Sequence, residues 1–153
     1  MDSCILKCQR IRLSDIATVE RAQKKLVYPK ETIYVQVSAC KKTDSNIFYM
    51  TQKEGHIETK YAVIVPTEQV VPAYLKIALN NAAGEFMQKY IGDNINIQME
   101  LFKYFELDYH RDISTQRYIC EKIGEVDNAI MAEQLLCDNW KDFKKVMLDK
   151  MMC

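Results

Sequence analysis

The sequence contains little glycine and little proline: four glycines and three prolines among 153 residues. Flexible linkers are rich in such residues, so the sequence indicates no long linker. It also has no run of about 18 apolar residues, and a transmembrane helix is therefore not expected. Residues 1–12 carry four charged side chains and lack the continuous apolar stretch of a secretory signal, so we expect a cytoplasmic location.

Patterns typical of a catalytic site are also missing. The sequence has neither a Walker loop nor a Gly-x-Gly-x-x-Gly motif. His56 and His110 stand far apart in polar surroundings, and we expect both at the surface rather than in catalysis. Cys4 and Cys8 are spaced like half of a zinc site, but no second close pair completes it. The six cysteines favour reduced, mostly structural thiols, and we expect no enzymatic activity, no metal and no cofactor.

Hydrophobic residues make up 48% of the chain, which is enough for one buried core at single-domain length. The net charge is zero but unevenly spread. Residues 1–53 contain ten Lys or Arg and five Asp or Glu, whereas residues 54–153 contain eleven and sixteen. This division is consistent with a basic face that binds a polyanion and another face that binds protein partners. An ordinary solvated surface would give the same charge distribution.

The first half of the sequence predicts strands and turns. Residues 32–38 alternate between apolar and polar side chains and are rich in β-formers, which predicts a strand. Residues 47–50 predict a shorter strand, and residues 54–55 predict a turn. Residues 61–65 are almost continuously apolar and precede Pro66, a pattern that indicates a buried central strand.

Helical spacing begins after Pro72, a residue that suits the first turn of a helix. Apolar residues recur at this spacing over residues 74–79, and Gly84 is expected to interrupt or end the helix. Residues 92–94 predict a turn, and residues 101–107 predict a helical turn followed by a strand.

Residues 114–150 predict one continuous helix, with Asp112 or Ser114 as its N-cap. Such a helix would be about 50 Å long, more than a compact domain of this size can cover. Its apolar residues follow a coiled-coil spacing that Glu133 and Lys144 interrupt. We therefore expect a dimer interface formed by Ile119, Ile123, Val126, Ile130, Trp140, Phe143 and Met147.

Four segments of the chain, taken in order, resemble those of a known family. Residues 13–17 are similar to a domain-opening Leu-Gly-Asp-Ile-Ala, and Pro29 stands where Pro-Gly often precedes the first core strand. Residues 92–98 are similar to the segment that precedes the family's junction between its globular domain and a long helix. At the junction Gln116 opens a helix with spaced apolar residues, which ends in a Lys-Lys motif within residues 140–151. Together these segments resemble one of the two repeated units of a type I restriction-modification specificity subunit.

The resemblance covers essentially the whole chain. It implies an α+β fold, in which a mixed β-sheet with packed helices forms a target-recognition domain over residues 1–111. A long coiled-coil helix follows over residues 112–153. The family's junction prolines are missing, and Ala22 and Lys30 replace two usual glycines, which affects loops more than the fold. A single unit rebuilds the two-domain arrangement only as a homodimer with antiparallel helices, which also avoids placing two Glu133 carboxylates opposite each other.

The resemblance also implies double-stranded DNA and a DNA methyltransferase subunit as partners, with catalysis in other subunits. DNA contact needs cations for phosphates and Arg, Lys, Asn or Gln for base edges. For each residue of these types, the alternative to DNA contact is that it is an ordinary solvated surface residue. The candidates are Lys24, Lys25, Lys30, Lys41, Lys42, Ser45 and Asn46, followed by Lys60, Asn94, Asn96 and Gln98.

Two hypotheses on function follow. In the first, a homodimer recognises a DNA sequence and docks a methyltransferase. In the alternative, the chain does not read DNA, occupies the place of a specificity subunit and modulates a restriction-modification complex.

Overall fold

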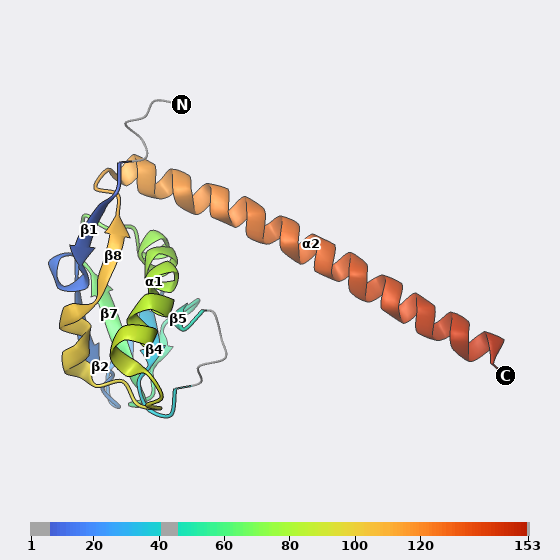
Figure 1. Ribbon diagram of the computed structural model, residues 1–153, viewed down its shortest axis with the longest axis horizontal. Helices are drawn as coiled ribbons and strands as arrows, with labels where there is room; N and C mark the ends of the chain where they lie inside the picture. Colours follow the sequence, from blue (N-terminus) through green and yellow to red (C-terminus); the bar gives the residue numbers. More distant parts are fainter. Residues whose placement is uncertain (1–6, 41–45, 153) are drawn as a thin grey trace. The chain divides into compact units, whose positions relative to one another are not determined.

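The computed structural model describes residues 7–40 and 46–152 of the chain (Figure 1). The chain divides into two units, residues 1–117 and residues 118–153. The described strands all belong to the first unit, and the second consists of most of the C-terminal helix. The division expected between residues 111 and 112 stays a prediction.

A four-stranded sheet forms the centre of the first unit. In spatial order its strands are β2 (Ala17–Arg21), β7 (Tyr61–Pro66), β4 (Ile33–Gln36) and β5 (Phe48–Met50). β7 is buried between β2 and β4, so the predicted central strand is confirmed, as are the strands predicted at β4 and β5. β2 was not predicted, because it is mostly exposed and carries polar and charged side chains that give no strand signal.

Two shorter strand pairs flank this sheet. They are β1 (Gln9–Arg12) with β8 (Glu106–Tyr109), and β3 (Val27–Tyr28) with β6 (Gly55–His56). The turn predicted at residues 54–55 was misplaced, because Gly55 already belongs to β6. The α+β class is confirmed, but every described strand pair is antiparallel, so the sheet is not mixed. β2 and β4 run parallel to each other, and β7 separates them.

The helix α1 (Pro72–Phe86) packs against the central sheet (Figure 1). It begins at Pro72, as predicted. Gly84 lies inside α1, so the prediction that it ends or interrupts the helix was wrong. The buried ring of Phe86 holds the last turn, and the π-helical turn η2 (Met87–Ile91) follows. Gly92 then turns the chain with a φ of 56°, a conformation that glycine adopts without strain.

The 3-10 helix η3 (Met99–Tyr104) precedes β8 and confirms the helical turn and strand predicted there. Phe86 and Phe105 pack with their ring centroids 4.7 Å apart, and Phe48 contacts Phe105 edge-on at 5.7 Å. These rings join α1, β5 and the chain before β8 in one apolar core. A further 3-10 turn, η1 (Leu13–Asp15), joins β1 to β2 and buries Leu13.

The C-terminal helix α2 (Ile113–Met151) is one continuous helix of 39 residues, as predicted. At 1.5 Å per residue it is about 58 Å long. Asp112, rather than Ser114, caps it, because Asp112 Oδ2 accepts hydrogen bonds from the N–H and the hydroxyl of Thr115, both at 2.9 Å. Among the described residues, no helix has the length and apolar character needed to cross a membrane.

Candidate nucleic-acid interface

One end of the central sheet collects polar side chains from distant parts of the sequence. β2 and β4 both run antiparallel to β7, so Arg21 and Gln36 at their ends lie beside Tyr61 at the start of β7. β5 begins at this end as well. We call this end the candidate interface and define it as residues 21–25, 36–40, 46, 58–60 and 94–98.

Arg21 fixes three parts of the candidate interface to one another. Its Nε donates a hydrogen bond to the Thr59 carbonyl at 2.8 Å, and its Nη2 donates to Ser38 Oγ at 2.8 Å. The backbone adds a further link, since the Val37 N–H donates to the Lys60 carbonyl at 2.9 Å. None of the sequence patterns singled out Arg21, because its role depends on partners that only the strand register brings near.

The chain after β4 is bonded to the segment before η3. The Cys40 N–H donates to the Ile95 carbonyl at 2.6 Å, and the Ile97 N–H donates to the Val37 carbonyl at 2.8 Å. Between these bonds, the Ala39 N–H donates to Asn96 Oδ1 at 2.9 Å. Asn96 therefore uses its carbonyl oxygen to hold the backbone, which makes it a positioning residue at this end.

A hollow of about 430 Å³ opens beside this segment. Asn94 and Gln98 are exposed at its wall, and their carboxamides form no hydrogen bond within the described part of the protein. A carboxamide both donates and accepts, which is the pattern that base edges require. The lining residues are Tyr90, Ile91, Asn94, Ile95, Asn96, Gln98 and Leu101.

The lysines predicted for DNA contact lie at different places. Lys24 and Lys25 form an exposed turn after β2, and Lys60 precedes β7, so all three belong to the candidate interface. Lys60 Nζ is 3.0 Å from Glu58 Oε2, and this hydrogen bond raises the pKa of Lys60. Lys30 precedes β4 and lies at the opposite end of that strand.

The loop after β4 is described only in part. Asn46 is exposed and immediately precedes the buried Ile47. Its neighbour Phe48 is fixed to α1, because Asn80 Oδ1 accepts from the Phe48 N–H at 3.0 Å and Asn80 Nδ2 donates to the Phe48 carbonyl at 3.1 Å. The candidates Lys41, Lys42 and Ser45 lie outside the described residues.

Two further lysines, which the sequence patterns did not single out, flank a pair of tyrosines beside the hollow. Tyr90 and Tyr104 stack with ring centroids 5.6 Å apart and an interplanar angle of 12°. Lys89 Nζ lies 5.4 Å from the centroid of Tyr90, and Lys103 Nζ lies 4.9 Å from that of Tyr104. Within the described residues neither lysine has a carboxylate oxygen within 4.0 Å, so both positive charges remain available to an anion.

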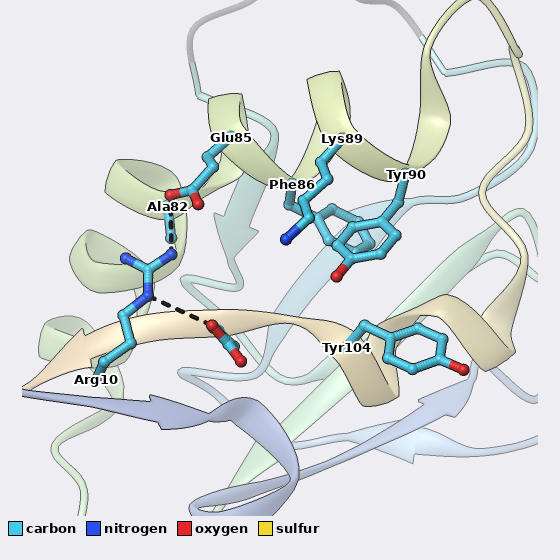
Figure 2. A pocket seen from close by; sticks show the side chains of 8 residues that line it. Arg10, Ala82, Glu85, Phe86, Lys89, Tyr90 and Tyr104 are labelled. Carbon is cyan, nitrogen blue, oxygen red and sulfur yellow. Dashed lines mark hydrogen bonds and ion pairs between the residues drawn. The ribbon is translucent and has the colours of Figure 1, made fainter.

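A different group of charges borders these tyrosines (Figure 2). Arg10 Nη2 is 2.8 Å from Glu85 Oε2, and the same guanidinium lies 3.7 Å from Glu106 and 3.5 Å from Asp108. The cavity here is about 20 Å³, room for about one water molecule. This cluster joins β1 and β8 to α1 and offers no space for a ligand.

The histidines and cysteines that the structure describes suggest no other site. His56 is exposed as expected, but His110 is half-buried, and its Nδ1 lies 2.8 Å from the Tyr74 hydroxyl. The expectation of a surface position was therefore wrong for His110, because the end of β8 packs against α1. Within residues 7–40 and 46–152, no group of three or more His, Cys, Asp or Glu is placed to hold a metal ion. Cys40 is buried, whereas Cys8 and Cys137 are exposed.

The exposed apolar residues on α2 form the stripe that the sequence predicted. Trp140 is 63% exposed and Phe143 is 56% exposed, and their rings meet edge-on at 5.9 Å. Ile123, Val126, Ile130 and Met147 are exposed as well, and Ile119 is half-buried. Whether these residues form a dimer interface stays a prediction.

No model of a protein family matches the sequence, and no curated protein matches it in sequence. Solved structures match the fold. The type I restriction-modification S subunit from M. genitalium has a TM-score of 0.63 and 12% identity, over 86% of this chain and 42% of that chain. The HsdS subunit from Thermoanaerobacter tengcongensis has a TM-score of 0.61 and 10% identity, over 82% and 38%. A chain from a structure of the assembly and conformational transition of the type I R-M system has a TM-score of 0.60 and 9% identity, over 82% and 39%. The chain thus has the fold of type I restriction-modification S subunits and spans less than half the length of each.

Proposed function

We propose that the chain is a sequence-specific DNA-recognition module of a type I restriction-modification system, without a catalytic site of its own. The observation that carries this proposal is the hollow, where Asn94 and Gln98 present unbonded carboxamides on a backbone fixed to the end of β4. Rigidly held amides at a surface suit direct contact with base edges. The similarity in fold to S subunits supports the same function.

Exposed lysines have a separate task in this proposal. Lys24, Lys25, Lys89 and Lys103 are exposed and without a carboxylate partner among the described residues, so they are suited to phosphates. Contacts to phosphates fix the position of the duplex and carry little sequence information. Arg21 and Asn96 bond to the protein itself and hold the loops in place.

The proposal includes a homodimer and a partner subunit. The apolar stripe on α2 is exposed along several turns, and a second copy would remove it from water. Each chain spans less than half of the S subunits it resembles, so two copies would supply two recognition units. We further propose that this dimer docks a DNA methyltransferase subunit, which would supply the chemistry.

A mobility-shift experiment tests this function. The purified full chain is mixed with a pool of random DNA duplexes, with and without a DNA methyltransferase subunit of a type I restriction-modification system. We expect a shifted fraction that is enriched in particular sequences. A shifted fraction with the composition of the input pool, in both conditions, would rule out sequence recognition.

The alternative is a protein that occupies the place of an S subunit without reading DNA. One observation favours it: the net charge of the chain is zero, whereas DNA-binding proteins are usually basic. The two functions respond differently to substitutions. If Lys24→Glu with Lys25→Glu leaves the effect on the restriction-modification complex intact while Ile123→Asp abolishes it, the alternative holds.

A further inference from the structure

A column of aromatic rings connects the buried core to the surface beside the hollow. Phe86, at the end of α1, is only 4% exposed, and its ring centroid lies 5.5 Å from that of Tyr90 in η2. Tyr90 stacks in turn on Tyr104, the last residue of η3, with centroids 5.6 Å apart and an interplanar angle of 12° (Figure 2). Tyr104 is 45% exposed, so the column ends in a ring that is open to water.

The geometry of η3 explains why Tyr104 lies at the surface. A 3-10 helix has three residues per turn, so residues three apart in sequence lie on the same face. Phe102 and Phe105 are such a pair, and both are buried. The Phe105 N–H also donates a hydrogen bond to the Phe102 carbonyl at 3.1 Å. Lys103 and Tyr104, which stand between them in sequence, are exposed. The buried pair therefore fixes the backbone that carries Tyr104.

The ring of Tyr104 is held in one orientation, while its hydroxyl contributes no hydrogen bond to the fold. Among the described residues, its contacts are the stacking on Tyr90 and the ammonium of Lys103, 4.9 Å from the ring centroid. A side chain that is already ordered loses little conformational freedom when a ligand binds to it. Tyr104 is thus suited to a ligand with a flat, aromatic face.

The charges near the column favour an anionic ligand. Lys89 and Lys103 lie beside the two stacked tyrosines, and neither has a carboxylate oxygen within 4.0 Å among the described residues. The carboxylates of Glu85 and Glu106, which line the neighbouring small cavity, instead lie within 4.0 Å of Arg10. A lysine side chain is flexible, so its ammonium can exchange a contact with a ring for one with a phosphate. Proteins that bind unpaired nucleotides combine aromatic rings and positive charges in this way.

An aromatic ring can stack on a base only where the face of that base is uncovered. Inside a duplex, each base is covered on both faces by its neighbours, and a side chain that reads the sequence contacts base edges in a groove. An unpaired base can turn out of the stack and lie against an aromatic side chain. Because turning out a paired base costs free energy, DNA in which the base is already unpaired should bind more tightly.

We infer that Tyr104 stacks on the base of an unpaired nucleotide in the bound DNA, with Lys89 and Lys103 at the adjoining phosphates. This inference rests on the proposed recognition of DNA and adds a feature of the substrate, a base that lies outside the double helix. Because Tyr90 belongs both to the column and to the wall of the hollow, this base lies next to the part of the duplex that the hollow contacts. Stacking on Tyr104 is sequence-tolerant and so has a different task from the carboxamides at the hollow.

Two DNA probes isolate the stacking. Both are the same fluorescently labelled duplex with one extra nucleotide in the middle of one strand. In the first probe this nucleotide carries adenine, and in the second it is abasic, which keeps the additional phosphate and removes the base. The full chain is titrated against each probe at one salt concentration, and fluorescence anisotropy gives the affinities. We expect the adenine probe to bind at least about fivefold more tightly, the lower end of the effect of stacking one base on an aromatic side chain.

Variants at position 104 separate stacking from other roles of the tyrosine. Tyr104→Phe and Tyr104→Trp keep an aromatic face, so both should retain the preference for the adenine probe. Tyr104→Ala should bind the two probes equally and should bind the abasic probe as the unsubstituted chain does. Tyr49 is 40% exposed on β5, so Tyr49→Ala is a matched control that should retain the preference. Circular dichroism verifies that each variant is folded.

The possible outcomes separate this inference from the proposed function. Equal affinities of the unsubstituted chain for the two probes would overturn the stacking, while the recognition of duplex DNA stands. A preference that Tyr104→Ala retains would overturn the role of Tyr104 in the same way. Binding to neither probe, nor to the fully paired duplex, would overturn both the inference and the proposed recognition of DNA.

Discussion

The side chain of Gln116 joins the first turn of α2 to the residue before α1: its Oε1 accepts a hydrogen bond from the Val71 N–H at 2.9 Å. Its Nε2 donates to the His110 carbonyl at 2.8 Å and lies 3.4 Å from the Gln69 carbonyl. The residue has no exposed surface. One buried carboxamide thus connects three backbone segments.

Gln116→Ala should destabilise the first unit by about 1–3 kcal/mol, because it leaves the N–H of Val71 and the carbonyl of His110 without their partner. Denaturant unfolding followed by circular dichroism measures the change. Gln134→Ala, at an exposed position of the same helix, is the control and should change stability little. Equal effects of the two substitutions would contradict the role assigned to Gln116.

Asp112 should make stability depend on pH. Its hydrogen bonds with Thr115 lower the pKa of Asp112 below the ordinary value of 3.8. A carboxyl whose pKa is lowered by folding stabilises the protein above its unfolded pKa, and this contribution is lost as the pH falls through the folded pKa. We expect the stability advantage over Asp112→Asn to be larger at about pH 7 than at about pH 3, which lies below the ordinary pKa of the carboxyl. Unfolding measured at both pH values checks this, and a constant difference would contradict it.

The Asn80 side chain should hold the start of β5, because it bonds both the N–H and the carbonyl of Phe48. Asn80→Ala should increase hydrogen exchange of the Phe48 N–H and lower stability by about 1–3 kcal/mol. The neighbouring Asn81 is exposed, so Asn81→Ala is a matched control. Unchanged exchange at Phe48 would show that the strand pairing with β4 holds this residue by itself.

The two lysines beside the stacked tyrosines should contact phosphates. Each phosphate contact contributes about 0.9 to the slope of log affinity against log salt concentration for duplex DNA. Lys89→Ala with Lys103→Ala should therefore reduce the slope by about 1.8 without changing the preferred sequence. Lys30→Ala, at the opposite end of β4, should leave the slope unchanged. Fluorescence anisotropy across a salt series gives the slopes, and equal slopes for all three proteins would show that Lys89 and Lys103 do not contact phosphates.

Elements with strong local patterns could be predicted from the sequence. The apolar run of β7, Pro72 at the start of α1 and the apolar spacing of α2 each depend on neighbouring residues only. β1 was missed, because three of its four residues are exposed and its pairing with β8 joins the two ends of the first unit. The helix was predicted to end or be interrupted at Gly84, but it continues to Phe86, because burial of Phe86 outweighs the low helix propensity of glycine.

Sequence alone could nominate only those residues of the candidate site whose side-chain type by itself suggests contact with DNA. Asn94 and Gln98 have side chains suited to base edges, and the structure places both at the hollow. Arg21 was missed, since its two partners come from other strands through the sheet register. The resemblance marked Gln116 as the start of the helix, but no pattern indicates that a glutamine is completely buried.

The central claim is that the hollow at the candidate interface reads DNA sequence. Asn94→Ala with Gln98→Ala removes both carboxamides and leaves every lysine and every backbone contact in place. The most direct measurement is repeated selection from random duplexes, followed by sequencing, for the unsubstituted chain and this variant. We predict that the unsubstituted chain enriches a defined sequence and that the variant loses preference at particular positions while retaining salt-dependent binding. Enrichment of the same sequence to the same degree by both proteins would contradict the account.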